Sequence, residues 1–304
     1  MMLWAESNYY ITRYLHSLDL GHFMVRLLSV FLGAALGLSV FAQNAWSADE
    51  FQDNTLALEG KLVQGGMIIG QAPPGSQVWL DGKSLELTSD GHFVFGFGRD
   101  AEADHDLKVI YPDGVQEQKA LAIKARDYDI QYIEGISKKI MSPNEDDLKR
   151  IREENALVSG ARGQFSTLKS FLETFIWPAK GPITGVYGSQ RYYNGEPRRP
   201  HFGLDIAAPR GAEVVAPASG KVVLVHDNMF FSGGTLIVDH GYGITSTFIH
   251  LDKILVEKGQ MVNQGDVIAL VGATGRATGP HLDWRINWFQ TRLDPGLLMA
   301  EPQP

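Results

Sequence analysis

The sequence contains no cysteine among its 304 residues. Disulfide bonds are therefore excluded, and a metal ion could be held only by histidine and carboxylate side chains, because thiolate ligands are missing. Basic residues are in the minority as well, since 27 Lys and Arg stand against 35 Asp and Glu for a net charge of −8. Nucleic-acid-binding proteins present a basic face, so this charge balance argues against a nucleic-acid partner.

Long hydrophobic runs are scarce, and one that stands out lies near the start of the chain. The apolar run 27–42 follows Arg26 and is followed by small residues, which is typical of a secretory signal peptide over residues 24–47. The run is shorter than the roughly 20 apolar residues of a membrane span. A buried core helix and an uncleaved anchor are the alternatives, and only with the anchor would the chain contact a membrane. Residues 1–23 match no part of a signal peptide, so we expect them to be an extension upstream of the true start at Met24. The protein is thus expected to be exported, to the periplasm or cell envelope.

The chain is long enough for two domains of roughly 100–200 residues each. Residues 50–135 alternate short apolar segments with Gly, Pro and Asp turn signals, which predicts a small β-sandwich. This segment gathers no catalytic groups, so we expect an accessory domain. Residues 175–300 are again rich in short strands and glycine turns, with almost no helical periodicity, and predict an antiparallel β domain.

The segment 140–174 is expected to be a helical linker between these domains. Ser142 and Glu145 form a capping box around Pro143, which predicts that a helix starts here and runs to about Val158. Apolar residues give this helix one hydrophobic face: Leu148, Ile151 and Leu157. A partner-binding helix is the alternative. The predicted fold class is mainly β, with an N-terminal β-sandwich, a helical connector and a C-terminal antiparallel β domain.

Two short motifs of the C-terminal domain concentrate side chains that can bind a metal: His201-Phe-Gly-Leu-Asp205 and His281-Leu-Asp283. The residues after Asp205 are poor helix formers, so we place the first pair on a loop that enters a strand. Residues two apart on a strand point to the same side, which joins His281 to Asp283. The two motifs can therefore aim His201, Asp205 and Asp283 at one cation, with His250 and His281 just outside. Imidazole and carboxylate ligands with an open position suit a catalytic zinc ion.

Residues 177–295 resemble the lysostaphin/LytM type of zinc-dependent peptidoglycan endopeptidase, which has the duplicated hybrid motif β fold. The stretches that carry the resemblance follow the order of that family: Gly185-Val-Tyr-Gly188, His201-Phe-Gly-Leu-Asp205-Ile-Ala-Ala-Pro, Val215-Ala-Pro-Ala-Ser-Gly-Lys-Val222, Thr247-Phe-Ile-His250-Leu, Val256-Glu-Lys-Gly-Gln-Met-Val-Asn-Gln-Gly-Asp266, Val271-Gly-Ala-Thr-Gly275 and Thr278-Gly-Pro-His-Leu282. The resemblance implies one Zn²⁺ per chain with His201 and Asp205 as ligands. It also implies that His250 and His281 are the catalytic pair that acts on the water.

The sequence departs from the family at position 283, where the third ligand is expected to be His and the chain has Asp. Zinc accepts carboxylate oxygens, so we retain Asp283 as the third ligand. Two carboxylates and one histidine neutralise Zn²⁺ formally, and this should weaken the activation of a bound water. The flanking residues Trp284 and Arg285 could position Asp283. A decayed site on a family fold is the alternative.

The resemblance implies hydrolysis of peptide bonds in the stems or cross-links of peptidoglycan, which makes peptidoglycan the expected partner. One of His250 and His281 would take the proton of the water, and the other would stabilise the oxyanion. The alternative is a catalytically degenerate relative that binds peptidoglycan or activates a cell-wall amidase. The presence of His201, Asp205 and both catalytic histidines favours the enzyme.

Overall fold

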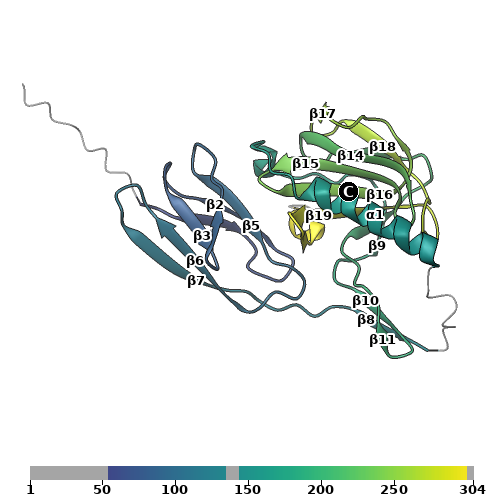
Figure 1. Ribbon diagram of the computed structural model, residues 1–304, viewed down its shortest axis with the longest axis horizontal. Coiled ribbons are helices and arrows are strands. Elements are labelled where there is room, and N and C mark those ends of the chain that lie inside the picture. Colours follow the sequence, from purple (N-terminus) through teal and green to yellow (C-terminus); the bar gives the residue numbers. More distant parts are fainter. Residues whose placement is uncertain (1–53, 135–143, 300–304) are drawn as a thin grey trace, which may run out of the picture. The chain divides into compact units, whose positions relative to one another are not determined.

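The computed structural model describes residues 54–134 and 144–299. The expected signal peptide over 24–47 and the upstream stretch 1–23 lie outside these ranges. All described residues belong to one compact unit, Phe51–Pro304. The unit consists mainly of antiparallel sheets, as the sequence predicted (Figure 1). Within the described ranges, no helix has the length and apolarity needed to cross a membrane.

The N-terminal strands form two antiparallel sheets. The first contains β1, β2 and β5 in that order: Ala57–Gly60, Met67–Gln71 and His92–Gly96. The second has the order β4, β3, β6, β7: Lys83–Leu85, Gln77–Leu80, Asp104–Ile110 and Gln116–Ala122. Both sheets contribute fully buried residues to one hydrophobic core, among them Phe93 from the first sheet and Val78 from the second. The two sheets therefore pack face to face as a β-sandwich, while the exact domain boundaries stay predictions.

The segment after the sandwich joins the C-terminal part of the chain through a parallel pairing. Strand β8 (Ile130–Ile133) pairs in parallel with β10 (Gln190–Tyr193), which is also antiparallel to β11 (Glu196–Pro197). The rings of Tyr132 and Tyr192, which are partners in this register, have centroids 5.1 Å apart. A parallel pair was not expected from the sequence, because its two strands lie far apart along the chain.

Helix α1 spans Glu145–Arg162, so the linker is helical as predicted but its ends differ. The N-cap is Asn144, whose side chain accepts a hydrogen bond from the Asp147 backbone N–H at 2.8 Å. The capping prediction for Ser142, which lies outside the described residues, was therefore wrong. The helix also continues past Gly160, because one glycine in a helix costs only about 1 kcal/mol, which packing can offset.

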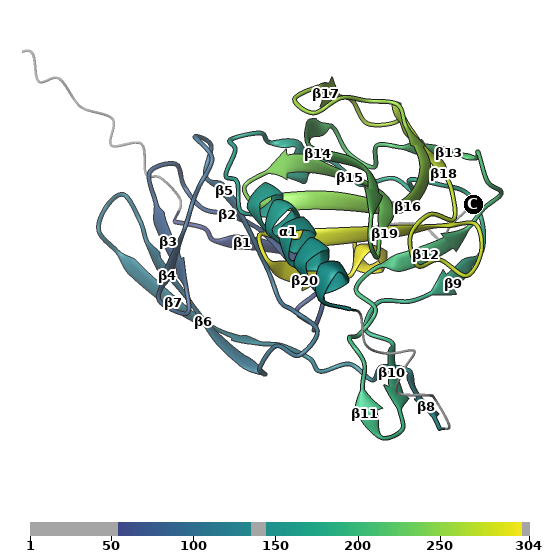
Figure 2. The same cartoon turned by 45° about the vertical axis from the view of Figure 1, so that its right-hand side comes forward.

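The buried face of α1 differs from the predicted one. Leu148 and Leu157 are 41% and 50% exposed, so the predicted apolar face is largely open to solvent. Instead, Ala161 and Val158 pack against buried residues of the strands β14 (Gly220–Met229) and β15 (Gly233–Gly241): Val223, Leu224 and Ile237 (Figure 2). The helix ends with Arg162, whose side chain lies buried beneath it.

The C-terminal sheet has the strand order β17-β14-β15-β16-β19-β12-β9. In addition, β18 pairs with β16 and with β13, and β20 pairs with β19. Strand β9 spans Ile183–Gly185. Strands β12 to β20 span, in chain order, Leu204–Ala207, Glu213–Val215, Gly220–Met229, Gly233–Gly241, Ile244–Ile254, Met261–Val262, Val267–Val271, His281–Trp288 and Thr291–Leu293. Short 3-10 helices occupy Ser170–Leu172 and Pro295–Leu297. Neighbouring strands of this sheet pair antiparallel, which confirms the predicted antiparallel β domain.

The central strand β19 contributes side chains both to the hydrophobic core and to the polar face of the sheet. Its residues Leu282, Trp284 and Ile286 are fully buried in the core. Because side chains alternate along a strand, His281, Asp283 and Arg285 point to the opposite face. The same alternation that buries the core therefore places the predicted site residues of β19 together on the other side.

A buried histidine on β15 makes the stability of this fold depend on pH. His240 is fully buried, and its two ring nitrogens lie 2.7 Å from the Ser219 carbonyl and 2.8 Å from Ser246 Oγ. Because a carbonyl only accepts, Nδ1 carries the proton and Nε2 accepts from the Ser246 hydroxyl. Burial lowers the pKa of His240, only partly opposed by the bond to Ser219, so the folded chain keeps this ring neutral where the unfolded chain protonates it.

We expect the free energy of unfolding to fall as the pH drops below about 6.5, with His240 contributing up to about 1.4 kcal/mol per pH unit. Below the ordinary histidine pKa the unfolded chain binds a proton at His240 that the folded chain does not bind. Lowering the pH therefore favours the unfolded state. Urea unfolding between pH 5 and 7 should show a shallower pH slope for His240→Asn, which keeps a donor for Ser219. An identical slope in both proteins would contradict this role of His240.

Candidate metal centre

The register between β12 and β19 brings the two predicted carboxylate ligands together. Asp205 and Asp283 are direct partners across the two antiparallel strands, and Ile249 of β16 pairs with Asp283 on the other side. Directly opposite residues share a face of the sheet. His201 precedes β12 on a loop, as the sequence predicted, and its backbone N–H donates to the Ser189 carbonyl at 2.8 Å.

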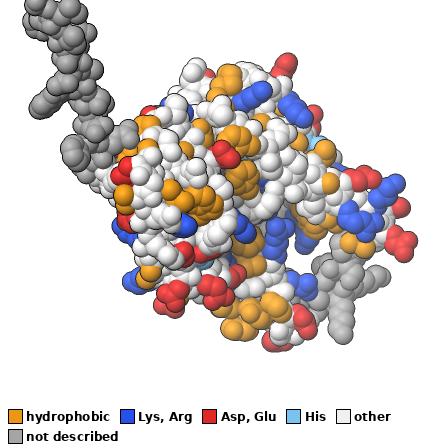
Figure 3. All heavy atoms as spheres, turned by 60° about the vertical axis from the view of Figure 1, so that its left-hand side comes forward, with side chains coloured by type: hydrophobic (Ala, Val, Ile, Leu, Met, Phe, Trp, Pro, Cys, Tyr) orange, Lys and Arg blue, Asp and Glu red, His pale blue; other side chains and the backbone are white. Residues whose placement is uncertain are grey.

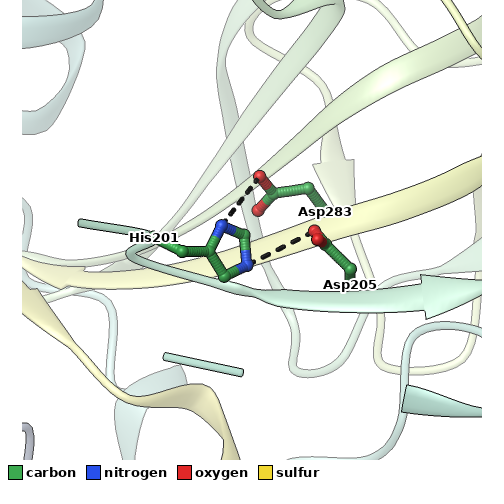
Figure 4. A group of neighbouring side chains, drawn as sticks. All are labelled: His201, Asp205 and Asp283. Atoms are coloured by element: carbon green, nitrogen blue, oxygen red, sulfur yellow. Dashed lines mark ion pairs between the residues drawn. The ribbon is translucent and has the colours of Figure 1, made fainter. Parts of the chain in front are cut away.

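The imidazole of His201 lies between the two carboxylates (Figure 4). Its Nε2 is 3.3 Å from Asp205 Oδ1, and its Nδ1 is 4.0 Å from Asp283 Oδ2. One ligand atom from each of the three residues lies within 4.8 Å of the others, so the group could hold a metal ion. The structure thus brings the predicted ligands together, while their role as ligands stays a prediction.

Two atoms of this group are buried without a hydrogen-bond partner in the described residues: His201 Nε2 and Asp205 Oδ1. A buried polar atom without a partner costs free energy, and such atoms are rare in folded proteins. His281 Nε2 approaches the same Asp205 oxygen at 3.8 Å. A cation bound between these atoms would satisfy both, so the donor set fits a zinc ion.

Glycines make room for both carboxylates. A Cβ on Gly185 would lie 2.3 Å from Asp205 Oδ2, and one on Gly203 would lie 2.3 Å from Asp283 Oδ1. Both distances are far below any van der Waals contact. Only glycine therefore leaves the space that the partly buried Asp205 and the buried Asp283 occupy.

Arg285 binds Asp283 through both of its oxygens. Its Nε donates to Oδ1 at 2.8 Å and its Nη2 donates to Oδ2 at 2.5 Å. Burial would raise the pKa of Asp283, which is only 2% exposed, but the Arg285 guanidinium outweighs burial and holds that pKa below its usual range. Arg285 thus positions Asp283, as the sequence suggested, whereas Trp284 points into the core.

The positive charge of Arg285 changes the charge balance expected from the sequence. Burial and the nearby charge of Asp283 raise the pKa of Asp205, which shows that the two carboxylates repel. Arg285 offsets one of these negative charges. Asp205, Asp283 and Arg285 together therefore carry one net negative charge, as would a site with one aspartate and two neutral histidines. A bound zinc ion would then not meet the extra negative charge that the sequence led us to expect.

The two predicted catalytic histidines are held in the same way. Nδ1 of His250 lies 2.8 Å from the Thr274 carbonyl, and Nδ1 of His281 lies 2.9 Å from the Gly279 carbonyl. Because carbonyls only accept, both Nδ1 atoms carry a proton, and in the neutral form of each ring Nε2 is the nitrogen with the lone pair. The ring centroids are 4.8 Å apart, and burial lowers the pKa of His250.

The backbone of His250 is held in a conformation that few residues adopt. Its φ of 66° lies in the left-handed region, which is uncommon outside glycine. The His250 backbone N–H donates to the Ser232 carbonyl at 2.8 Å, and the register of the adjoining pairs shifts beside it. Such local strain tends to persist where it directs a functional side chain.

Several groups of the site had no signal in the sequence. The carbonyls of Thr274 and Gly279 act through the backbone, which any residue type could supply. Arg285, in contrast, had a signal, because it follows Asp283 by two residues and strand alternation places both on one face. Two further arginines beside the site were not predicted: the buried Arg162 at the end of α1 and the partly buried Arg292 on β20.

Part of the chain matches a known family of peptidases. Residues 199–295 match Peptidase family M23. The peptidoglycan DD-endopeptidase ShyB of Vibrio cholerae is 47% identical over 87 residues, which are 29% of this chain and 20% of ShyB. The murein hydrolase activator NlpD of Escherichia coli is 30% identical over 124 residues, which are 41% of this chain and 31% of NlpD. The chain thus spans less than a third of the length of either relative.

A solved structure extends the similarity beyond these segments. A Pseudomonas aeruginosa protein assigned to peptidase M23 has a TM-score of 0.62 and 32% sequence identity to this chain. The similarity covers 79% of this chain and 96% of that protein, so it includes the sandwich as well as the C-terminal sheet. The arrangement of His201, Asp205, His250 and His281 lies within the matched fold, and the chain belongs to peptidase family M23.

Proposed function

We propose that the chain is a zinc-dependent endopeptidase that hydrolyses peptide bonds in the stems or cross-links of peptidoglycan. The observation that carries this proposal is the pair of buried, unpartnered atoms His201 Nε2 and Asp205 Oδ1, which face each other at 3.3 Å. His250 and His281 stand beside them, and His281 Nε2 lies 3.8 Å from Asp205 Oδ1. The names of the relatives ShyB and ShyA, both peptidoglycan DD-endopeptidases, support the substrate class.

His201, Asp205 and Asp283 would hold one Zn²⁺ per chain. Both oxygens of Asp283 accept from Arg285, but each carboxylate oxygen has two lone pairs. Oδ2, which faces His201, can therefore bind the ion without losing its hydrogen bond. A bound zinc ion would supply Lewis-acid polarisation of the scissile carbonyl.

The tautomers of the two histidines decide what each can do. Each Nδ1 donates to a carbonyl, so in the neutral form of each ring Nε2 is an acceptor. Either ring can take a proton from a water molecule, but neither Nε2 can donate to an oxyanion until it has been protonated. The ring that accepts the first proton therefore becomes the donor for the later step.

We also propose export to the periplasm or cell envelope through the signal peptide expected over residues 24–47. Two relatives with segments similar to this chain are named as a lipoprotein and as a murein hydrolase activator, YgeR and NlpD of Escherichia coli. Partners inferred on this basis are peptidoglycan and, for the alternative function, a cell-wall amidase.

A second candidate function is a noncatalytic regulator that binds peptidoglycan or activates an amidase. One observation favours it: Asp283 and Arg285 already form a closed, two-bond ion pair that satisfies both carboxylate oxygens without a metal. The unpartnered atoms of His201 and Asp205 favour the enzyme, because that ion pair does not reach them.

Purified peptidoglycan incubated with the zinc-loaded chain should release new muropeptides, and a chelator should abolish the release, because the metal polarises the scissile carbonyl. Mass spectrometry of the soluble products identifies the bond. A folded protein that releases nothing, and that stimulates an amidase added to the same digest, would establish the regulator instead.

His250→Ala and His281→Ala should each lower the rate of this digestion by about 10²–10⁴-fold while leaving zinc bound, since both act on protons rather than on the metal. The zinc content of each variant, measured by elemental analysis, separates loss of chemistry from loss of metal. His226→Ala is the matched control, because His226 lies on β14 outside the site. Full activity in both site variants would refute their catalytic role.

A further inference from the structure

Four arginines meet beside the candidate metal centre, and we call them the arginine cluster: Arg162, Arg199, Arg285 and Arg292. We propose that this cluster is a subsite for a free carboxylate of the peptide substrate. The inference rests on the proposed peptidase function and adds a requirement on the substrate. A space-filling view shows basic side chains gathered in a recess on one face of the molecule (Figure 3).

The strand register places two of these arginines on the polar face of the sheet, and a hydrogen bond brings a third beside them. Arg285 of β19 is the direct partner of Thr247 on β16, and Thr247 Oγ1 accepts a hydrogen bond from Arg162 Nη2 at 3.0 Å. Arg292 of β20 is the direct partner of Asn287, two residues beyond Arg285 on the same strand. Alternation and pairing therefore put Arg285 and Arg292 on one face, next to the guanidinium of Arg162.

Phe202 connects the fourth arginine to the cluster. The guanidinium carbons of Arg199 and Arg292 lie 5.7 Å and 5.8 Å from the centroid of the Phe202 ring. Phe202 directly follows the candidate ligand His201 in the chain. The cluster therefore begins at the metal centre rather than at a distant surface.

The cluster carries more positive charge than its surroundings neutralise. Across residues 54–134 and 144–299, the ion pairs of the structure include Arg285 with Asp283 but none with Arg162, Arg199 or Arg292. Burial and then the neighbouring arginines lower the pKa of Arg292 to about 9, and the same causes lower the pKa of Arg162. Unpaired buried charge of one sign is costly, so an anion that enters the cluster would be strongly favoured.

Unpartnered polar atoms mark where such an anion would lie. Arg162 Nε and Arg292 Nη1 are buried donors without a hydrogen-bond partner among the described residues, and Arg162 is only 3% exposed. The hydroxyl oxygen of Thr245, the cross-strand partner of Asn287, is also buried without a hydrogen-bond partner among the described residues. Such donors are normally satisfied by protein, water or a ligand.

A carboxylate is the anion that fits both the chemistry and the position. Guanidinium groups bind carboxylates through two parallel hydrogen bonds. Arg285 and Asn287 follow Asp283 along β19 by two and four residues, which is about 7 and 13 Å at roughly 3.3 Å per residue. An extended peptide whose scissile bond lies at the metal centre would thus place a carboxylate about two to four residues away in the cluster.

The test compares two probes that differ only in this charge: N-acetyl-alanyl-alanine and its C-terminal amide. Their dissociation constants are measured by calorimetry on the full chain after chelator treatment, so neither zinc nor hydrolysis is needed. We expect the acid to bind about tenfold more tightly than the amide, as charge-assisted hydrogen bonds provide. A chain that cleaves nothing but keeps this preference would reject the proposed enzyme and retain the subsite.

Arg292→Gln and the more exposed Arg199→Gln should each reduce the preference for the acid severalfold, and their melting curves verify that they fold. Arg210→Gln is the matched control, because Arg210 pairs with Asp252 on the exposed surface and should keep the full preference. Equal binding of acid and amide by the unmodified chain, or an unchanged preference in both cluster variants, would overturn the proposal. Displacement of the acid by an equal concentration of acetate would show a site for any small anion, which also overturns it.

Discussion

The site depends on one constraint of the sheet: Asp205 and Asp283 are directly opposite each other on adjacent strands. Two like charges in this position repel and destabilise a sheet unless a positive charge compensates them. The residues around the two carboxylates make room for them or reduce their repulsion. Gly185 and Gly203 give the carboxylates room, Arg285 neutralises one of them, and His201 stands between them.

Arg285 and a metal ion would together compensate the negative charges of Asp205 and Asp283, and neither would displace the other. Arg285 binds both oxygens of Asp283, while Asp205 Oδ1 and His201 Nε2 have no hydrogen-bond partner among the described residues. The aspartate at position 283, combined with this arginine, has the net charge of the neutral histidine that the family resemblance led us to expect. The departure at position 283 is therefore matched by a second residue on the same face of β19. Arg162, Arg199 and Arg292 have no carboxylate partner in the ion pairs of the described residues, so they extend positive charge away from the metal centre.

Much of this architecture could be read from the sequence because it depends on local patterns. Alternation along 281–288 predicted the strand and the shared face of His281 and Asp283, and turn signals predicted the sandwich. The parts that were missed depend on contacts between distant segments. The parallel pairing of β8 with β10 and the burial of Arg162 at the end of α1 have no local pattern. Helix α1 lost its predicted apolar face because smaller residues, Ala161 and Val158, fit closely against β14 and β15.

The most direct test of this account is a crystal structure of the zinc-loaded chain, with anomalous diffraction data collected on both sides of the zinc edge. We expect a single anomalous peak bound by His201 Nε2, Asp205 Oδ1 and an oxygen of Asp283, at about 2.0–2.2 Å. Asp283 should still accept from Arg285 in that structure. No peak at this position in a crystal soaked with zinc, with the Asp283–Arg285 pair unchanged, would contradict the account.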